Sequence, residues 1–112
     1  MTSKPPDKIA EAKVVLHLEV EVEQKDRPRF LRFCRKAFPV YESVGGNRMA
    51  LYEDRAKPGR FDEVGYYKTL ADYRRSEAAI RNDPVQAALI KEWRSLLKAP
   101  PEVSVFVRKE FQ

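Results

Sequence analysis

One short stretch near the N-terminus alternates ionisable residues with aliphatic ones. Residues 14–24 read VVLHLEVEVEQ, so His17, Glu19, Glu21 and Glu23 occupy every second position. In a strand, side chains at alternate positions share one face and lie about 7 Å apart. An imidazole and carboxylates on one face are groups that bind a metal ion, exchange protons with a substrate, or form cross-strand ion pairs.

A metal site does not fit this pattern. Three ligands in a row along one strand cannot converge on a single ion, and the chain has only one histidine and one cysteine. A structural zinc site needs four such ligands in a tetrahedral arrangement. We therefore predict that the protein has no metal site.

Acid–base chemistry fits the same stretch better, because histidine is the side chain that ordinarily titrates near neutrality. We predict that His17 acts as a general base and that Glu19 orients its ring. Such a base takes a proton from an acidic hydroxyl group of a substrate. The alternative is a structural histidine on a half-polar sheet face, with Glu21 and Glu23 offset by cations on neighbouring strands.

The elements that position these side chains follow from hydrophobic periodicity. Alternation predicts a first strand over about 13–23. A helix follows, whose apolar stripe has helical spacing and consists of Phe30, Phe33, Cys34, Ala37 and Tyr41. Pro39 predicts that this helix kinks or ends near Phe38, because proline lacks the backbone donor that a helix needs.

The second half of the chain repeats strands and a helix. A glycine turn at 45–47 leads into a strand over 48–54, and a hairpin leads into a third strand over 61–67. The region 70–97 is predicted to form a helix that is capped by Thr69. We expect this helix to be broken at Asn82-Asp83, because Asp83-Pro84 is a second signal for a helix start. A last strand lies within 102–111. The order β-α-β-β-α-β predicts an α+β, ferredoxin-like antiparallel sheet with two helical segments on one face.

Length and composition predict one domain over 13–112 after a flexible leader over 1–12. We expect no membrane segment, because no apolar run is long enough to span a bilayer. A single cysteine and the absence of a signal-like N-terminus predict a cytoplasmic location. Net charge is +5, with cations crowded in 25–36 and 55–60. Such cations can track phosphates, but we interpret them as a solvated face and expect no nucleic-acid partner.

Aromatic residues supply the second half of a possible ligand site. A pocket for a flat organic molecule is mostly apolar, with a few polar groups that fix orientation. Tyr52 and Tyr66 alternate with core residues on the predicted hairpin, and Tyr73 lies in the first turn of the following helix. The residues predicted to bind a small organic ligand are Tyr52, Tyr66, Tyr73, Phe106 and Arg108.

The run from about 13 to 111 resembles the dimeric α/β-barrel superfamily, and within it the antibiotic biosynthesis monooxygenase-like domains. The matching features are the strand VVLHLEVEVEQ, the turn ESVGGNRMALYED and the segment RFDEVGYYKTLADYRRSEAAIRNDP. In that family an aromatic strand leads into a helix with a small-residue step and a break before proline. Tyr66-Tyr67, Glu77-Ala78 and Asp83-Pro84 occupy these places.

The resemblance implies a homodimer in which two sheets form a barrel. It also implies a cavity, between each sheet and its own helices or toward the barrel interior, that binds a small organic molecule. The implied activity is that of a cofactor-independent oxygenase of an aromatic or quinol-type substrate, so no cofactor is expected. The alternative is a non-catalytic ligand-binding or interaction module of the same fold. The haem-degrading branch fits less well, because no histidine follows His17 and the first strand has no asparagine.

Overall fold

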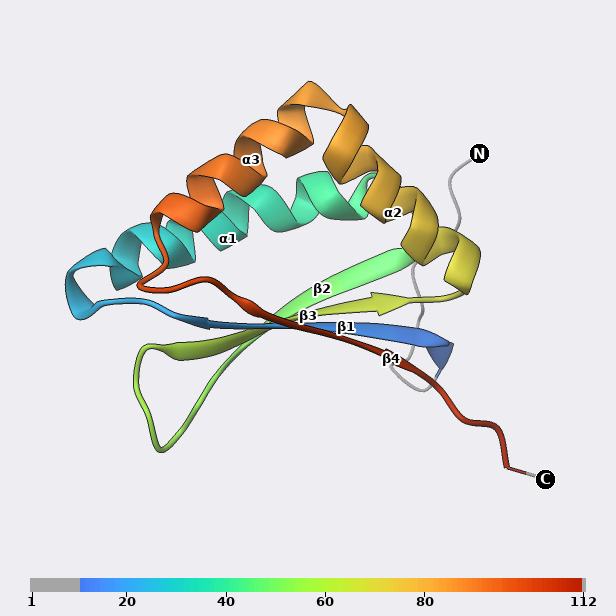
Figure 1. Ribbon diagram of the computed structural model, residues 1–112, viewed down its shortest axis with the longest axis horizontal. Coiled ribbons are helices and arrows are strands. Elements are labelled where there is room, and N and C mark those ends of the chain that lie inside the picture. Colours follow the sequence, from blue (N-terminus) through green and yellow to red (C-terminus); the bar gives the residue numbers. More distant parts are fainter. Residues whose placement is uncertain (1–10, 112) are drawn as a thin grey trace.

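Residues 11–111 are described by a computed structural model, in which helices cover one face of a four-stranded sheet (Figure 1). The strands lie in the order β2-β3-β1-β4, and every neighbouring pair is antiparallel. Their bounds are β1 (Val14–Glu21), β2 (Asn47–Glu53), β3 (Arg60–Tyr67) and β4 (Glu102–Val107). Of the predicted leader, 1–10 lies outside the described residues, and Ala12 is already buried against Val64 and Tyr66.

The helices are α1 (Arg27–Glu42), α2 (Leu70–Asn82) and α3 (Pro84–Ser95), and a short 3-10 turn, η2 (Gln24–Asp26), precedes α1. The predicted β-α-β-β-α-β order is thereby confirmed, with the second helical region divided in two. Figure 1 shows all three helices on the same side of the sheet, with α2 and α3 meeting at an angle. No described helix lies over the opposite face, which we call the open face.

The predicted break in the second helical region is confirmed by two side-chain caps. Thr69 accepts a hydrogen bond from the backbone N–H of Asp72 at 3.1 Å, and its hydroxyl donates to the Asp72 carboxylate at 2.7 Å. Asp83 accepts from the N–H of Val85 at 2.9 Å and so caps α3. Each cap satisfies an N–H that has no partner within its own helix, which fixes where α2 and α3 begin.

Of the two alternatives predicted at Pro39, a kink or an end near Phe38, the helix end is wrong, because α1 continues through Pro39 to Glu42. Proline removes only its own donor, and the carbonyl of Pro39 still accepts from the N–H of Ser43 at 3.0 Å. The side chain of Tyr41, in this last turn, packs against the core. Tertiary packing thus outweighs the local preference of proline for a helix end.

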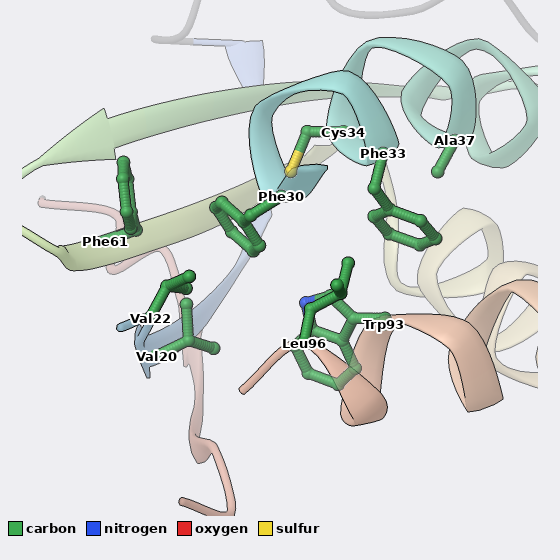
Figure 2. Close-up of a cluster of buried hydrophobic side chains, with 9 residues drawn as sticks. All are labelled: Val20, Val22, Phe30, Phe33, Cys34, Ala37, Phe61, Trp93 and Leu96. Atoms are coloured by element: carbon green, nitrogen blue, oxygen red, sulfur yellow. The ribbon is translucent and has the colours of Figure 1, made fainter. Parts of the chain in front are cut away.

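The core forms where α1 and α3 meet the covered side of the sheet (Figure 2). Phe30 is fully buried and packs on Phe61 with ring centroids 4.8 Å apart. Trp93 and Leu96 extend from α3 toward Phe33 (Figure 2). The buried cluster consists of Val20, Val22, Phe30, Phe33, Cys34, Ala37, Phe61, Trp93 and Leu96. The predicted apolar faces of β1 and α1 therefore meet as expected.

Gly65 of β3 leaves room for an aromatic ring on the covered face. A Cβ at this position would lie 2.8 Å from a ring carbon of Tyr67, closer than carbon atoms pack. Tyr67 is itself held by Tyr73, whose ring meets it edge-on with centroids 5.2 Å apart. The ring of Tyr67 therefore fits only because Gly65 has no side chain, since Tyr73 blocks the other side of the ring.

We therefore expect Gly65→Ala to lower the free energy of unfolding by about 1–3 kcal/mol, as overpacking does in a core. Urea denaturation of the single variants and of Gly65→Ala/Tyr67→Leu measures this. The double variant is expected to recover part of the loss, because the smaller leucine leaves room for the new methyl group. Strictly additive losses would contradict the proposed clash.

Candidate functional site

The phase of β3 places one carboxylate on the covered face of the sheet. Phe61, Glu63, Gly65 and Tyr67 occupy alternate positions, and Phe61 and Tyr67 are buried beneath the helices. Glu63 faces the same way and is only 2% exposed. Its strand lies between β2 and β1 in the sheet. A buried carboxylate of this kind needs a partner or a proton.

The partner of Glu63 is the indole of Trp93, whose Nε1–H donates a hydrogen bond to a carboxylate oxygen. Burial raises the pKa of Glu63 to about 7, an increase that the indole hydrogen bond opposes and the nearby Asp62 carboxylate reinforces. A carboxyl group that titrates near neutrality can both accept and return a proton at physiological pH. Glu63 therefore has the properties of a general base.

Glu63 and Trp93 line a cavity of about 40 Å³ between the sheet and the helices. Most of its wall is apolar, and Leu16, Leu18 and Met49 come from the sheet side. This volume holds about two water-sized groups, so an aromatic ligand can enter only if the walls move outward. Three further residues of the wall are buried and polar: Asn47, Ser76 and Gln86.

Two of these polar side chains have hydrogen-bonding capacity to spare. Asn47 is 1% exposed and donates from its amide nitrogen to the carbonyl of Tyr41 at 3.2 Å. Among residues 11–111, nothing hydrogen-bonds to Asn47 Oδ1 or to Ser76 Oγ, although both atoms are buried. Buried polar atoms are normally satisfied, so these two mark the cavity as a place where a polar ligand would gain bonds. The geometry thus combines a base, an indole donor and two free polar atoms.

The sequence interpretation missed Glu63, although a signal was present. In RFDEVGYY the residues in phase with Phe61 and Tyr67 are Glu63 and Gly65, so period-2 alternation places the carboxylate on the apolar side. Trp93 could not be connected to it in the same way. The two residues are 30 positions apart and meet only because α3 packs over β3.

His17, the predicted base, lies on the open face and belongs to a different cluster. Its Nδ1 is 2.8 Å from a carboxylate oxygen of Asp62, and the edge of its ring meets Phe106 with centroids 5.3 Å apart. The prediction that Glu19 orients the imidazole must be corrected. Glu19 lies within 3.6 Å of the Arg60 guanidinium, and Asp62 takes the place beside His17 because it is diagonally opposite on β3.

Arg60 also approaches Glu21 at 3.9 Å, so its guanidinium is a cross-strand cation for two carboxylates of β1.

Tyr52 and Tyr66 lie on the same open face, with their hydroxyl oxygens 3.1 Å apart. Burial raises the pKa of Tyr66 to about 12, so its phenol stays protonated at neutral pH. Arg108 lies beyond the end of β4 and is exposed. Of the predicted set, His17, Tyr52, Tyr66 and Phe106 therefore share the open face, away from the cavity.

Tyr73 occupies an intermediate place. It does not line the cavity, but its ring packs on Tyr67, which does. Its hydroxyl donates to the Glu77 carboxylate at 3.3 Å, and burial raises its pKa. Tyr73 therefore supports the aromatic wall from outside and can influence a ligand only through Tyr67.

No helix in the described part of the chain is long and apolar enough to cross a membrane. Over the same residues, no three His, Cys, Asp or Glu side chains come together in a way that would hold a metal ion. The cavity beneath the helices and the cluster on the open face are built from hydrogen-bonding and aromatic groups.

Comparisons with known proteins identify the fold. No family profile matches the sequence, and no curated protein matches it either. A candidate antibiotic biosynthesis monooxygenase from Deinococcus radiodurans superposes with a TM-score of 0.72 at 13% identity, covering 88% of this chain and 95% of the other. SnoaB, a cofactor-independent oxygenase from Streptomyces nogalater, gives 0.72 at 16% identity, covering 88% and 94%. A NIPSNAP family protein from Agrobacterium tumefaciens gives 0.71 at 15% identity, covering 88% of each chain.

The chain therefore has the fold of the antibiotic biosynthesis monooxygenase-like proteins, as its resemblance to them implied. At these identities the likeness defines the fold and not the reaction.

The ionisation of Glu63 leads to a testable pH dependence of stability. Its folded pKa of about 7 lies above the ordinary 4.5, so the folded protein binds this proton more tightly than the unfolded chain does. The contribution is complete below pH 4.5, falls as pH rises toward 7, and is lost above it. We expect the free energy of unfolding of Glu63→Gln, taken relative to that of the wild type, to rise by about 3 kcal/mol from pH 5 to pH 8. Urea unfolding at the two pH values measures this difference.

Trp93 is the only tryptophan and bonds to this carboxylate, so its fluorescence is an independent readout. The native wild type should show a fluorescence transition near pH 7, and Glu63→Gln should not. His17→Gln serves as the control, because His17 lies on the other face of the sheet and should leave the transition in place. A transition abolished by His17→Gln and retained in Glu63→Gln would contradict the assignment.

Proposed function

We propose that the protein binds a small hydroxylated aromatic molecule in the cavity between sheet and helices, and oxidises it as a cofactor-independent oxygenase. The observation that carries this proposal is the Glu63 carboxylate, which is buried against Trp93 and titrates near neutrality. The free polar atoms of Asn47 and Ser76 support a ligand that forms hydrogen bonds. The fold of SnoaB, a cofactor-independent oxygenase, supports the reaction class.

In the proposed mechanism the Glu63 carboxylate accepts the proton of a phenolic hydroxyl. The resulting phenolate is electron-rich and reacts with dioxygen, the co-substrate. One oxygen atom enters at the ring carbon opposite the hydroxyl, the hydrogen on that carbon is lost, and the second oxygen atom leaves as water. A phenol thereby becomes a quinone, and the proton held by Glu63 and the hydrogen lost from the ring carbon together complete the water. The Trp93 N–H stabilises the carboxylate before the proton is transferred.

The experiment compares bases on the two faces of the sheet. Oxygen uptake is measured with small quinols and phenols for wild type, Glu63→Gln and His17→Gln. We expect Glu63→Gln to lower kcat by about 10²–10⁴, the usual contribution of a general base, and His17→Gln to leave it within about threefold. Loss of activity in His17→Gln alone would move the reaction to the open face, where His17 pairs with Asp62.

A second function is favoured by the size of the cavity. At about 40 Å³ it is largely filled by the protein's own side chains, as expected for a non-catalytic ligand-binding or interaction module. The NIPSNAP family neighbour has the same fold and supports this alternative. Failure of every quinol and phenol to stimulate oxygen uptake or to change Trp93 fluorescence would favour it over the oxygenase.

We further propose that the protein is a homodimer that packs its open faces together, and that it works in the cytoplasm, where the free Cys34 would stay reduced. The open face carries large exposed side chains, with Tyr52 at 47% and Phe106 at 57%. No described helix covers them, and β4 leaves an unpaired edge beside them. Exposed apolar surface of this kind favours association with a partner.

Sedimentation at micromolar concentration should give twice the mass of the single chain. Phe106→Glu places a charge in the middle of the proposed contact and should shift the protein toward monomer. Leu31→Glu is the matched control, because Leu31 is 48% exposed on α1, at the opposite side of the molecule. A monomeric wild type, or equal effects of the two variants, would refute the proposed face.

A further inference from the structure

The positive charge of the protein is concentrated on two neighbouring helices. Together α1 and α3 carry seven basic residues and two acidic ones, so this pair holds a net charge equal to that of the whole chain, +5. The remainder of the chain is balanced. The residues concerned are Arg27, Arg29, Arg32, Arg35, Lys36, Lys91 and Arg94, against Glu42 and Glu92. A solvated helix normally mixes both signs along its exposed side, so this segregation calls for a partner.

Most of these cations are not neutralised within the molecule. Lys36 of α1 pairs with Glu92 of α3 at 2.9 Å, and Arg29 lies 3.9 Å from Asp26. Within 11–111, no carboxylate forms an ion pair with Arg32, Arg35, Lys91 or Arg94, although all four are exposed. Their charge is therefore available to a ligand.

The two helices enclose a groove with an apolar floor. Arg29, Arg32 and Lys36 form one wall, at a spacing that places them on one flank of α1. Glu92 of α3 stands opposite, and the buried side chains of Phe33 and Leu96 lie at the bottom. In Figure 2, Phe33 of α1 and Leu96 of α3 approach each other from the two helices. The groove holds about 240 Å³.

We infer that this groove binds an acidic helix of a partner protein. A helix with carboxylates spaced about four residues apart would match the row of cations on α1, and apolar side chains on the same side would reach the floor. Lys36 already neutralises Glu92 across the groove, so Arg29 and Arg32 are the cations of this wall that the carboxylates of a partner helix would meet. Arginine-rich surfaces with an apolar centre are also typical of protein interfaces.

The size of the surface predicts a weak, transient complex. A 16-residue helix such as α1 is about 24 Å long, and a second helix packs about 10 Å from it. A contact about 24 Å long and about 10 Å wide covers on the order of 240 Å², below the roughly 800 Å² per partner of a stable interface. This inference does not depend on the oxygenase proposal, and the helical face stays accessible if the open sheet faces pair.

The probe is a fluorescent 16-residue helical peptide with glutamates every four residues and leucines beside them. We expect binding by anisotropy at low salt that weakens at least about tenfold at 0.3 M salt. Arg29→Glu/Arg32→Glu, which reverses two charges of the groove wall, should weaken binding at least about tenfold. Arg55→Glu/Lys57→Glu makes the same charge change on the exposed β2–β3 loop and should stay within about twofold of wild type.

Three outcomes would overturn the inference. Equal weakening by the two double variants would mean that only net charge matters. Equal binding of a scrambled peptide of the same composition would exclude recognition of a helix by the groove. Tighter binding of a 20-base-pair DNA duplex than of the peptide would assign the basic face to nucleic acid instead.

Discussion

The burial of the Glu63 carboxylate beneath α3 is the constraint on which the candidate site depends. Residues of a strand alternate between faces, so the position of Phe61 and Tyr67 in the core forces Glu63 to the same side. Because β3 lies inside the sheet, the carboxylate is held there by pairing on both edges. The indole of Trp93 donates a hydrogen bond to one carboxylate oxygen. Burial raises the pKa of Glu63, so the carboxyl group takes up a proton more readily than it would in water. A leucine or methionine at this position would pack with less cost, which is why we assign Glu63 a role in binding or chemistry.

The two faces of the sheet separate two sets of polar groups. The covered face brings Glu63, Trp93, Asn47 and Ser76 to one small cavity. The open face carries the His17–Asp62 pair, which is partly buried, and the Tyr52–Tyr66 pair, of which Tyr52 is exposed and Tyr66 is buried. Backbone pairing between strands keeps the sets apart, since no side chain of a flat sheet can reach through it. A proton acceptor for a ligand in the covered cavity must therefore come from the covered side.

The charge distribution follows the same division into layers. The outer side of α1 and α3 is basic, whereas the carboxylates of β1 are offset by Arg60 within the sheet. Association through the sheet would leave the helices facing outward, so the two proposed contacts do not compete for surface. A dimer would then display two basic grooves.

The sequence alone determined the elements and their order, because each depends on residues within a few positions of one another. Alternation in VVLHLEVEVEQ defined β1, the stripe from Phe30 to Ala37 defined the buried side of α1, and the caps at Thr69 and Asp83 located α2 and α3. Only the tertiary structure decided that Asp62, and not Glu19, lies beside His17, because this depends on the register between β1 and β3. It likewise decided that Glu63 meets Trp93, since that contact requires α3 to pack over a strand 30 residues earlier. Local periodicity determines which face a side chain takes, but only the packing of distant segments determines its partners.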